Sequence, residues 1–313
     1  MGARALPRRQ RDPSRPVGEL LRHLGHPRRR PGARGPRLVL ATALETVDGH
    51  RVRVARLGAG PPLVLLHGYP ENLQIWCEVA PRLAERFAVI AFDWPGMGFS
   101  EPWPGGKTPG HMADRLLRLL DAWQIERATI VGMDMGGQPA LSFAARHAAR
   151  ITRLVVMNSL VLWDEETSWE IRILRRFRWN QLVLRRLPWV VFRRAEATFL
   201  PSGTRLPPAL RADFWESFRR YAVRDHIARM CGGYQGSLPR LPALYPGIRC
   251  PALVLWGERD KHFPLAHAAR LHAAIGGSEL EVLPGGAHWM AWHAADEVAL
   301  RIRRFASAAA PGV

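Results

Sequence analysis

Residues 132–137 read Gly-Met-Asp-Met-Gly-Gly, and Asp134 in this segment is the strongest candidate for a catalytic nucleophile. An apolar run at 128–131 comes before it and a helical pattern follows it. Small residues at 132 and 136 permit a sharp strand–turn–helix that pushes residue 134 out above a sheet. Serine is the usual occupant of such a position. A carboxylate is ionised at neutral pH without a base and suits displacement at saturated carbon, which leaves an alkyl ester for water to hydrolyse.

Two later segments supply the partners that this chemistry needs. A Gly-Glu-Arg-Asp segment ends at Asp260, after an apolar run at 252–256, and His288 lies in a glycine-rich segment after another run at 279–283. We expect Asp260 to orient the imidazole of His288 and stabilise its cation, and His288 to activate water against the ester. Asp134 alone is also consistent with a helix N-cap or with a serine hydrolase that has lost its nucleophile. The complete set of three favours catalysis.

The segment His-Gly-Tyr-Pro at 67–70 follows another apolar run, at 63–66. Its turn can direct the backbone N–H of Tyr69 toward the nucleophile, and Met135 can supply a second N–H, so that the two form an oxyanion hole. In this reaction the hole serves ester hydrolysis, because the carbonyl that water attacks belongs to Asp134 itself. We expect His67 to brace the turn, and the segment Asp93–Ser100 to form a structural turn.

Short apolar runs alternate with helical patterns along most of the chain, and these elements must position the candidate residues. Helical patterns occur at 111–123 and 138–147, and the later apolar runs are continuous, which is typical of strands buried on both faces. The alternation predicts an α/β fold with a mostly parallel eight-stranded sheet and helices on both faces. The predicted strands are Leu38–Thr42, Val52–Arg56, Leu63–His67, Ala88–Phe92, Ala128–Met133, Leu154–Asn158, Ala252–Trp256 and Glu279–Leu283.

The alternation stops at residues 160–248, where the sequence becomes helical, rich in Arg and Trp and punctuated by proline. Because the strand pattern resumes at 252, we interpret this stretch as a helical cap or lid. It is inserted between two strands of one core, which comprises residues 38–159 and 249–308. Such an insertion lies at the carboxyl ends of the strands, where open α/β sheets bind ligands.

Arginine dominates the charge of the chain, whose formal net charge is +18. Residues 1–37 hold eleven arginines against Asp12 and Glu19 and are rich in Pro and Gly. We expect this segment to be a disordered tail, and we expect no nucleic-acid partner. The second basic run, 172–194, alternates eight arginines with Trp, Leu, Val and Phe. It favours the solvated face of amphipathic helices, with a membrane-surface role as the alternative.

Composition also bears on location and on metal sites. The sequence has no apolar run of the ~18 residues that a transmembrane helix needs, and its N-terminus lacks the apolar core of a signal peptide. Cys77, Cys231 and Cys250 lie far apart, which favours neither a disulfide framework nor a metal site. We therefore expect a cytoplasmic protein without metal or cofactor, whose partners are a small apolar organic substrate and water. The oligomeric state is left open.

Taken together, the segments HGYP, DWPGMGFS, GMDMGG, GERD and GAHW resemble the Asp-nucleophile branch of the α/β-hydrolase superfamily, over residues from about 38 to 307. This branch includes epoxide hydrolases, haloalkane dehalogenases and fluoroacetate dehalogenases. The order of nucleophile, acid and histidine along the chain is that of the superfamily. The resemblance implies the α/β-hydrolase fold and a triad of Asp134, Asp260 and His288.

Three positions distinguish among the enzymes of this branch. Haloalkane dehalogenases typically hold the halide with Trp after the nucleophile and with Asn or Trp after the His-Gly, where this chain has Met135 and Tyr69. The arginines that fluoroacetate dehalogenases carry just after the nucleophile are missing from 135–138. HGYP matches the HGxP motif of epoxide hydrolases. The resemblance therefore favours an epoxide-hydrolase-like enzyme. The alternatives are a dehalogenase with an unusual halide site and a non-catalytic ligand-binding protein.

Epoxide hydrolases use cap tyrosines to protonate the leaving alkoxide, which is too basic to leave unassisted. Tyr234-Gln235 resembles the Tyr-Arg of their cap, so Tyr234 is the first candidate for this role and Tyr221 the second, with Tyr245 also near the cap. Packing is the other interpretation of each tyrosine. The tryptophans of the cap can line an apolar pocket, hold a halide or form the core of the cap; they include Trp163, Trp169 and Trp179.

Overall fold

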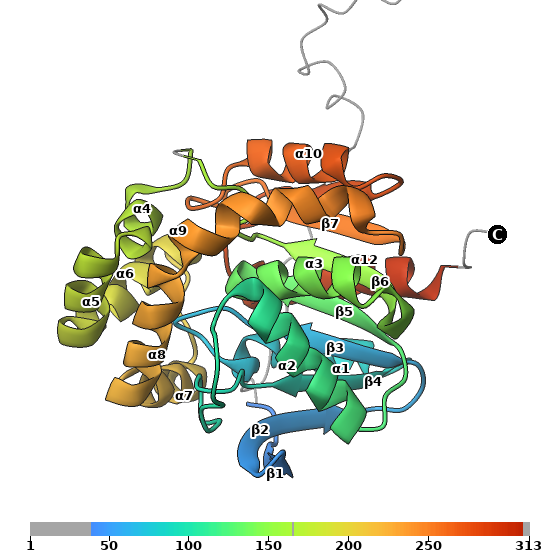
Figure 1. Ribbon diagram of the computed structural model, residues 1–313, viewed down its shortest axis with the longest axis horizontal. Helices are drawn as coiled ribbons and strands as arrows, with labels where there is room; N and C mark the ends of the chain where they lie inside the picture. The colour runs from blue at the N-terminus through green and yellow to red at the C-terminus, as the bar shows by residue number, and fades with distance from the viewer. Residues whose placement is uncertain (1–38, 165, 309–313) are drawn as a thin grey trace, which may run out of the picture. The chain divides into compact units, whose positions relative to one another are not determined.

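The computed structural model describes residues 39–164 and 166–308. Residues 1–37, for which we expect a disordered tail, lie outside the described residues, as does Leu38. The described chain forms an eight-stranded sheet with helices on both of its faces (Figure 1). In Figure 1, α2 (Pro109–Ala122) and α3 (Gly137–Arg146) lie in front of the sheet, and α12 (Ala295–Ser307) lies behind it.

The sheet is mostly parallel, as predicted. Its strand order is β1-β2-β4-β3-β5-β6-β7-β8, in which β2 is antiparallel to both of its neighbours and all other neighbouring pairs are parallel. The strands β5 and β7 are buried along their whole length, because helices cover both faces of a parallel strand. The strands are β1 (Ala43–Val47), β2 (His50–Leu57), β3 (Pro62–Leu66), β4 (Ala88–Phe92), β5 (Ala128–Met133), β6 (Ile151–Met157), β7 (Ala252–Gly257) and β8 (Glu279–Leu283).

The prediction of the first strand was wrong in position. We predicted Leu38–Thr42, whereas β1 spans Ala43–Val47. Asp48 and Gly49 have positive φ angles of 51° and 78°, so they can close a two-residue hairpin turn of the kind that Asp-Gly favours. That turn joins β1 to β2 and sets the pairing between them. The local turn signal therefore decides where β1 lies, and not the apolar run before it.

The remaining elements of the core follow the predicted alternation. The helical patterns at 111–123 and 138–147 correspond to α2 and α3. These two helices pack against each other, and α1 packs against α12. The other core elements are η2 (Leu73–Trp76), α1 (Val79–Leu83), η3 (Asp134–Gly136), η4 (Ala148–Arg150), α10 (Leu265–Ala274) and α11 (Met290–His293).

Between β6 and β7 the described chain is helical, in the stretch where the sequence predicts a cap; we call residues 160–248 the helical insertion. Its helices gather to the left of the sheet in Figure 1. Arg53 on β2 donates two hydrogen bonds to Asp213 in the insertion, at 3.0 and 2.7 Å, which ties the insertion to the sheet. Its elements are α4 (Trp169–Arg175), α5 (Phe177–Arg186), α6 (Pro188–Phe199), α7 (Pro208–Phe218), α8 (Tyr221–Gly232), α9 (Tyr234–Ser237) and η5 (Leu238–Gly247).

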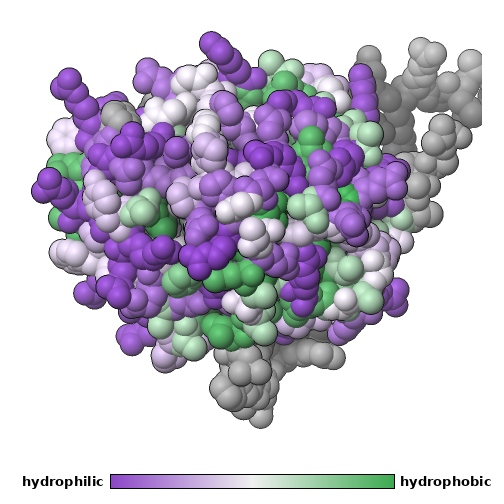
Figure 2. Space-filling view, turned by 60° about the horizontal axis from the view of Figure 1, so that its bottom comes forward, coloured by the Kyte–Doolittle hydropathy of each residue, from purple (hydrophilic) through white to green (hydrophobic). Residues whose placement is uncertain are grey.

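The surface reflects the arginine-rich composition. Figure 2 shows a face that is mostly hydrophilic, with small hydrophobic patches between the polar side chains. Large aromatic side chains are instead concentrated in the interior, where Trp76, Trp94, Trp256 and Trp289 are fully buried. None of the helices in the described part of the chain has the length and apolar character that crossing a bilayer requires.

Candidate active site

Asp134 lies at the turn between β5 and α3 with a positive φ angle of 51°. Two glycines make this turn possible. A Cβ on Gly132 would lie 2.4 Å from the carbonyl oxygen of Gly136, and a Cβ on Gly136 would lie 2.5 Å from that of Leu66. The left-handed conformation is uncommon for an aspartate and costs free energy. The backbone N–H of Asp134 donates to the carbonyl of Asn158 at 3.1 Å, which helps to hold it there.

The structure brings Asp134, Asp260 and His288 together from the carboxyl ends of β5, β7 and β8. Nδ1 of His288 lies 2.8 Å from Oδ2 of Asp260, which is a hydrogen-bond distance. Nε2 of His288 faces Oδ1 of Asp134 at 3.9 Å, which is too long for a hydrogen bond. His288 is therefore held by Asp260 and directed toward Asp134.

The charges in this group determine the protonation of His288. Burial opposes protonation, but the charges of Asp260 and Asp134 outweigh it and raise the pKa of His288 to about 10. Burial also favours the neutral form of Asp260, yet the neighbouring His288 and backbone N–H donors hold the pKa of Asp260 below its ordinary value. Those donors are His262 and Phe263, at 2.7 and 3.2 Å from Oδ1. The resting site is therefore an imidazolium between two carboxylates.

Tyr69 and Met135 are the predicted oxyanion donors. The backbone N–H of Tyr69 donates to Oδ2 of Asp134 at 3.1 Å. Met135 follows Asp134 within η3, and its side chain is buried. The N–H of Tyr69 is thus in place to stabilise negative charge on an oxygen of the Asp134 carboxyl group.

His67 braces the turn that carries Tyr69. Its Nδ1 donates to the carbonyl of Gly68 at 2.6 Å, and its Nε2 accepts the N–H of Trp94 at 3.1 Å. Burial lowers the pKa of His67 to about 4. The ring is therefore neutral at physiological pH, and both of its nitrogens are used in holding the loop.

Glu71 is a buried acid near the triad that the sequence analysis missed. It accepts the N–H of Gly68 at 3.1 Å and the indole N–H of Trp289 at 3.0 Å. Burial and the nearby charge of Asp134 raise the pKa of Glu71 to about 7, although His288 opposes part of this shift. Glu71 directly follows HGYP, but no spacing in the sequence distinguishes it from a solvent-exposed glutamate.

Asn158 is a second residue that the sequence analysis did not assign to the site. Its Nδ2 donates to the carbonyls of Ala287 and His288 at 3.1 and 3.0 Å, and its Oδ1 accepts the N–H of Gly257 at 2.8 Å. It therefore connects the chain after β6 to β7 and to the loop of His288. The available signal was its place at the end of a predicted strand, next to the ends of the strands that carry the triad.

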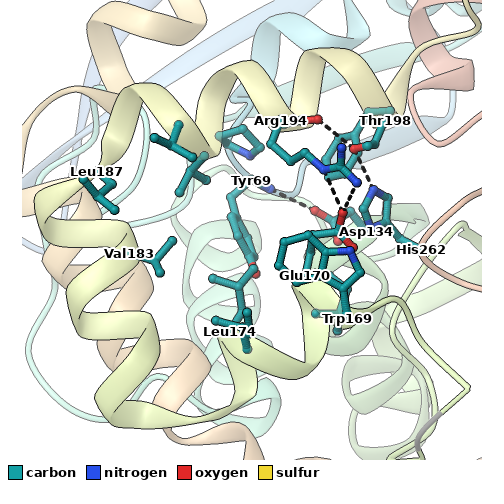
Figure 3. A pocket seen from close by; sticks show the side chains of 17 residues that line it. Tyr69, Asp134, Trp169, Glu170, Leu174, Val183, Leu187, Arg194, Thr198 and His262 are labelled. Atoms are coloured by element: carbon teal, nitrogen blue, oxygen red, sulfur yellow. Dashed lines mark hydrogen bonds and ion pairs between the residues drawn. The ribbon is translucent and has the colours of Figure 1, made fainter.

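An apolar cavity of about 200 Å³ reaches Asp134. Figure 3 shows it enclosed by helices of the insertion, with Leu174, Val183 and Leu187 among its walls. Polar groups on one side of the cavity are already paired, since Arg194 binds Glu170 at 2.6 Å (Figure 3). A cavity of this size and lining suits a small apolar molecule.

The model of the alpha/beta hydrolase fold family matches residues 61–295 of the chain. The chain belongs to this family. The α/β-hydrolase is 31% identical to an uncharacterised protein of Mycobacterium tuberculosis over 257 residues. This aligned region covers 78% of this chain and 74% of that protein. It is 35% identical to the soluble epoxide hydrolase of a Corynebacterium species over 114 residues, 36% of this chain and 40% of that enzyme. The solved structure of the enol-lactonase from Burkholderia xenovorans has a TM-score of 0.72 and 25% identity, and covers 85% of this chain and 100% of that one.

Tyr234 is buried in the helical insertion of the α/β-hydrolase, close to Asp134. It lines a small cavity together with Tyr69, Asp134 and Gln138. Burial and the charges around it raise the pKa of Tyr234 well above its ordinary value, so the phenol stays protonated. The hydroxyl of Tyr69 accepts a hydrogen bond from the thiol of Cys231 at 3.3 Å. Two tyrosine side chains thus lie beside the carboxylate: Tyr234, the first candidate from the sequence, and Tyr69, whose side chain was not expected there.

The other two tyrosines near the cap lie elsewhere. Tyr221 is 59% exposed and lines neither of the cavities that reach Asp134. It begins α8, where Tyr221 and Ala222 are exposed, whereas Tyr234 begins α9 after the end of that helix and is buried. Tyr245 is buried and donates its hydroxyl to the carbonyl of Val161. The structure therefore separates Tyr221 and Tyr245 from the triad.

The cap tryptophans serve different parts of the insertion. Trp163 is partly buried against the core, beneath the guanidinium of Arg175 at 4.5 Å. Trp169 lines the cavity and is nevertheless 54% exposed, and Trp179 is 57% exposed. Of the possibilities that the sequence left open, a core position therefore fits Trp163 and a pocket-lining position fits Trp169, whereas Trp179 is mostly exposed.

One group of possible metal ligands occurs in the described part of the chain. The ligand atoms of Asp164, Glu166 and His267 lie within 4.8 Å of one another. Asp164 already binds His267 at 2.9 Å and Arg270 at 2.8 Å. None of these residues belongs to the triad, so the group has no part in the chemistry considered below.

Proposed function

We propose that this α/β-hydrolase forms an alkyl ester on Asp134 and hydrolyses it with water activated by His288, and that its substrate is a small apolar epoxide. The observation that carries the proposal is a carboxylate at the strand–turn–helix position. Oδ2 of Asp134 is held by the N–H of Tyr69, Oδ1 faces His288, and the group borders an apolar cavity. The helical insertion acts as the cap that encloses this cavity.

In the first step, Oδ1 of Asp134 attacks a carbon of the epoxide while the bond from that carbon to the ring oxygen breaks. The ring oxygen takes the phenolic proton of Tyr234, because an alkoxide needs a proton to leave at neutral pH. Tyr234 suits this role, since its pKa is raised and it lines a cavity with Asp134. The product of this step is a hydroxyalkyl ester of Asp134.

The second step depends on a change in His288. Esterification removes the negative charge of Asp134, which lies 3.9 Å from Nε2 and contributes to the raised pKa of His288. The pKa therefore falls when the ester forms, and the imidazolium gives its proton to the phenolate of Tyr234. The neutral ring can then take a proton from water. The resulting hydroxide attacks the Asp134 carbonyl, whose oxygen is stabilised by the N–H of Tyr69. Cleavage transfers the proton of the added hydroxide to the leaving alkoxide, releases the diol and restores the carboxylate, with His288 protonated again.

A trapped intermediate tests this proposal. His288→Gln should leave Asp134 able to attack while removing the base that activates water, so the ester should accumulate. Intact-protein mass spectrometry after exposure to an accepted epoxide should show an adduct of the whole epoxide mass, and peptide mapping should place it on Asp134. A haloalkane substrate would instead add its mass less hydrogen halide, which would identify a dehalogenase.

The matched control is the double variant Asp134→Ala/His288→Gln, which should form no adduct. Asp134→Ala alone should lower turnover by at least roughly 10⁴-fold, the scale of losing a nucleophile. An adduct on another residue would overturn the carboxylate mechanism. If the wild type consumes no epoxide or haloalkane yet binds apolar ligands, the protein is a non-catalytic binding member of the family.

A further inference from the structure

Each of the helices α4, α5 and α6 exposes a tryptophan beside one or more arginines. The three tryptophans are between 54 and 57% exposed, which is unusual for so large an apolar side chain. Arg172, Arg186 and Arg193 lie three, seven and four residues after the tryptophan of their helix and so on its side, and Arg178 directly precedes Trp179. These exposed groups are Trp169 with Arg172 on α4, Trp179 with Arg178 and Arg186 on α5, and Trp189 with Arg193 on α6. We call this surface the Trp/Arg face.

The exposed groups of these helices belong to one connected surface. Trp169 and Arg172 of α4 line a surface hollow together with Trp179 of α5. Trp169 also lines the cavity that reaches Asp134, as does the exposed Val190 of α6. The Trp/Arg face is therefore continuous with the lining of the cavity that reaches Asp134, because Trp169 belongs to both.

The charge of this surface is strongly positive. Residues 168–194 hold eight arginines and no lysine, against Glu170 alone, which gives a net charge of +7. Arg178, Arg186 and Arg193 are exposed, and no carboxylate in the described part of the chain pairs with them. Exposed apolar side chains accompany them, such as Leu182, which is 50% exposed. A partner must therefore offer both negative charge and an apolar layer.

We propose that the Trp/Arg face docks on an anionic lipid bilayer, with the mouth of the cavity toward the lipid. Tryptophan favours the boundary between headgroups and acyl chains, and arginine is attracted to the negative surface potential of anionic lipids. A second copy of the chain would bring two positively charged faces together and be repelled. A nucleic acid would satisfy the arginines but not Leu182 and Val190. The proposal concerns docking and holds whichever reaction Asp134 performs.

Co-sedimentation of the full-length protein with lipid vesicles tests the docking surface. We expect binding to vesicles of phosphatidylcholine with phosphatidylglycerol, little binding to pure phosphatidylcholine, and weaker binding as salt rises from ~0.1 to ~0.5 M. Arg178→Glu/Arg186→Glu should lower the partition coefficient at least about tenfold. Trp179→Ala/Trp189→Ala should lower it about fivefold or more, since the interfacial aromatic contacts are lost.

The matched control is Arg86→Glu/Arg249→Glu, which makes the same change of charge. Both residues are exposed, and Arg86 lies two residues before β4 and Arg249 three residues before β7. They therefore lie near the amino ends of the strands, opposite the triad. The control should retain the wild-type partition coefficient, and so should Asp134→Ala. Equal losses in the two arginine pairs would show a general charge effect and overturn the proposal. It would also be overturned by full binding in the tryptophan variant, or by a preference for an oligonucleotide over the vesicles.

Discussion

At the scale of single residues, the proposed mechanism combines a nucleophile that is ready at rest, Asp134, with a base that becomes active later, His288. Asp134 needs no deprotonation before it attacks, so His288 has no role as a base in the first step. The carboxylates on either side keep His288 protonated at rest. The histidine can act as a base once an ester has replaced one of those charges. This order of events follows from placing a carboxylate where a serine is usual.

Tyr234→Phe should slow ester formation from an epoxide by roughly 10²-fold, the lower range for general acid catalysis. Hydrolysis of the ester should change little, because His288 and water carry that step. Single-turnover kinetics with an accepted epoxide separates the two rates. Tyr221→Phe is the matched control, since Tyr221 is exposed and away from the cavity, and it should behave like the wild type. Unchanged ester formation in Tyr234→Phe would assign Tyr234 to packing.

The raised pKa of His288 should also make stability depend on pH. The folded pKa of about 10 exceeds the ordinary 6.5, so the protonated ring stabilises the folded state fully below pH 6.5. This contribution is lost as pH rises through 10, with a slope of at most about 1.4 kcal/mol per pH unit. Urea denaturation between these pH values should show the fall in the wild type and a flatter profile in His288→Gln. The exposed histidine variant His111→Gln should keep the wild-type slope, and equal slopes in all three proteins would contradict the assignment.

At the scale of elements, the triad exists because the carboxyl ends of parallel strands meet at one edge of the sheet. The strands β5, β7 and β8 end one, three and five residues before Asp134, Asp260 and His288. β6 lies between β5 and β7 and contributes Asn158. Its side chain bonds to Gly257 at the end of β7 and to the loop of His288 after β8, and its backbone carbonyl accepts from Asp134 after β5. Its positive φ angle of 38° turns the amide toward them. β6 therefore aligns the carboxyl ends of β5, β7 and β8.

Asn158→Ala should destabilise the protein by about 2–3 kcal/mol, because it leaves buried carbonyl and N–H groups without partners. The free energy of unfolding in urea measures the loss. Gln124→Ala is the matched control, since Gln124 is exposed and also has a positive φ angle, 55°. It tests the cost of the backbone conformation without the buried hydrogen bonds, so its effect should be under about 1 kcal/mol. Similar losses in the two variants would show that Asn158 matters only for its backbone.

At the scale of the whole described chain, the helical insertion is fastened to the sheet by a mostly buried ion pair between Arg53 and Asp213. Asp213 on α7 accepts from Arg53 on β2 and from the side-chain amide of Asn72 at 2.7 Å. Arg53 and Asp213 have side chains only 10 and 18% exposed. Buried ionic contacts of this kind position one element against another more than they add stability. The enclosure of the cavity over Asp134 therefore depends on contacts outside the triad.

Asp213→Ala should lower the free energy of unfolding by about 2 kcal/mol, because Arg53 loses its main partner in a mostly buried position. Glu216→Ala, on the same helix, is the matched control. The pair of Glu216 with Arg219 is 50 and 56% exposed, so its loss should cost less than about 0.5 kcal/mol. Urea denaturation compares the two variants. An effect of Asp213→Ala no larger than that of Glu216→Ala would show that this contact does not fasten the insertion.

The sequence alone was sufficient for the fold and for the three residues of the candidate triad. Apolar runs and glycine-bounded turns are local signals, and the carboxyl ends of parallel strands necessarily share one edge, so Asp134, Asp260 and His288 could be grouped without coordinates. Tertiary structure alone placed Tyr234 in the interior beside Asp134 and Tyr221 in solvent, because the burial of α8 and α9 depends on what packs against them. It also disclosed Glu71 and Asn158. Glutamate and asparagine are common on protein surfaces. The roles of these two residues arise from their burial and from partners far away in the chain.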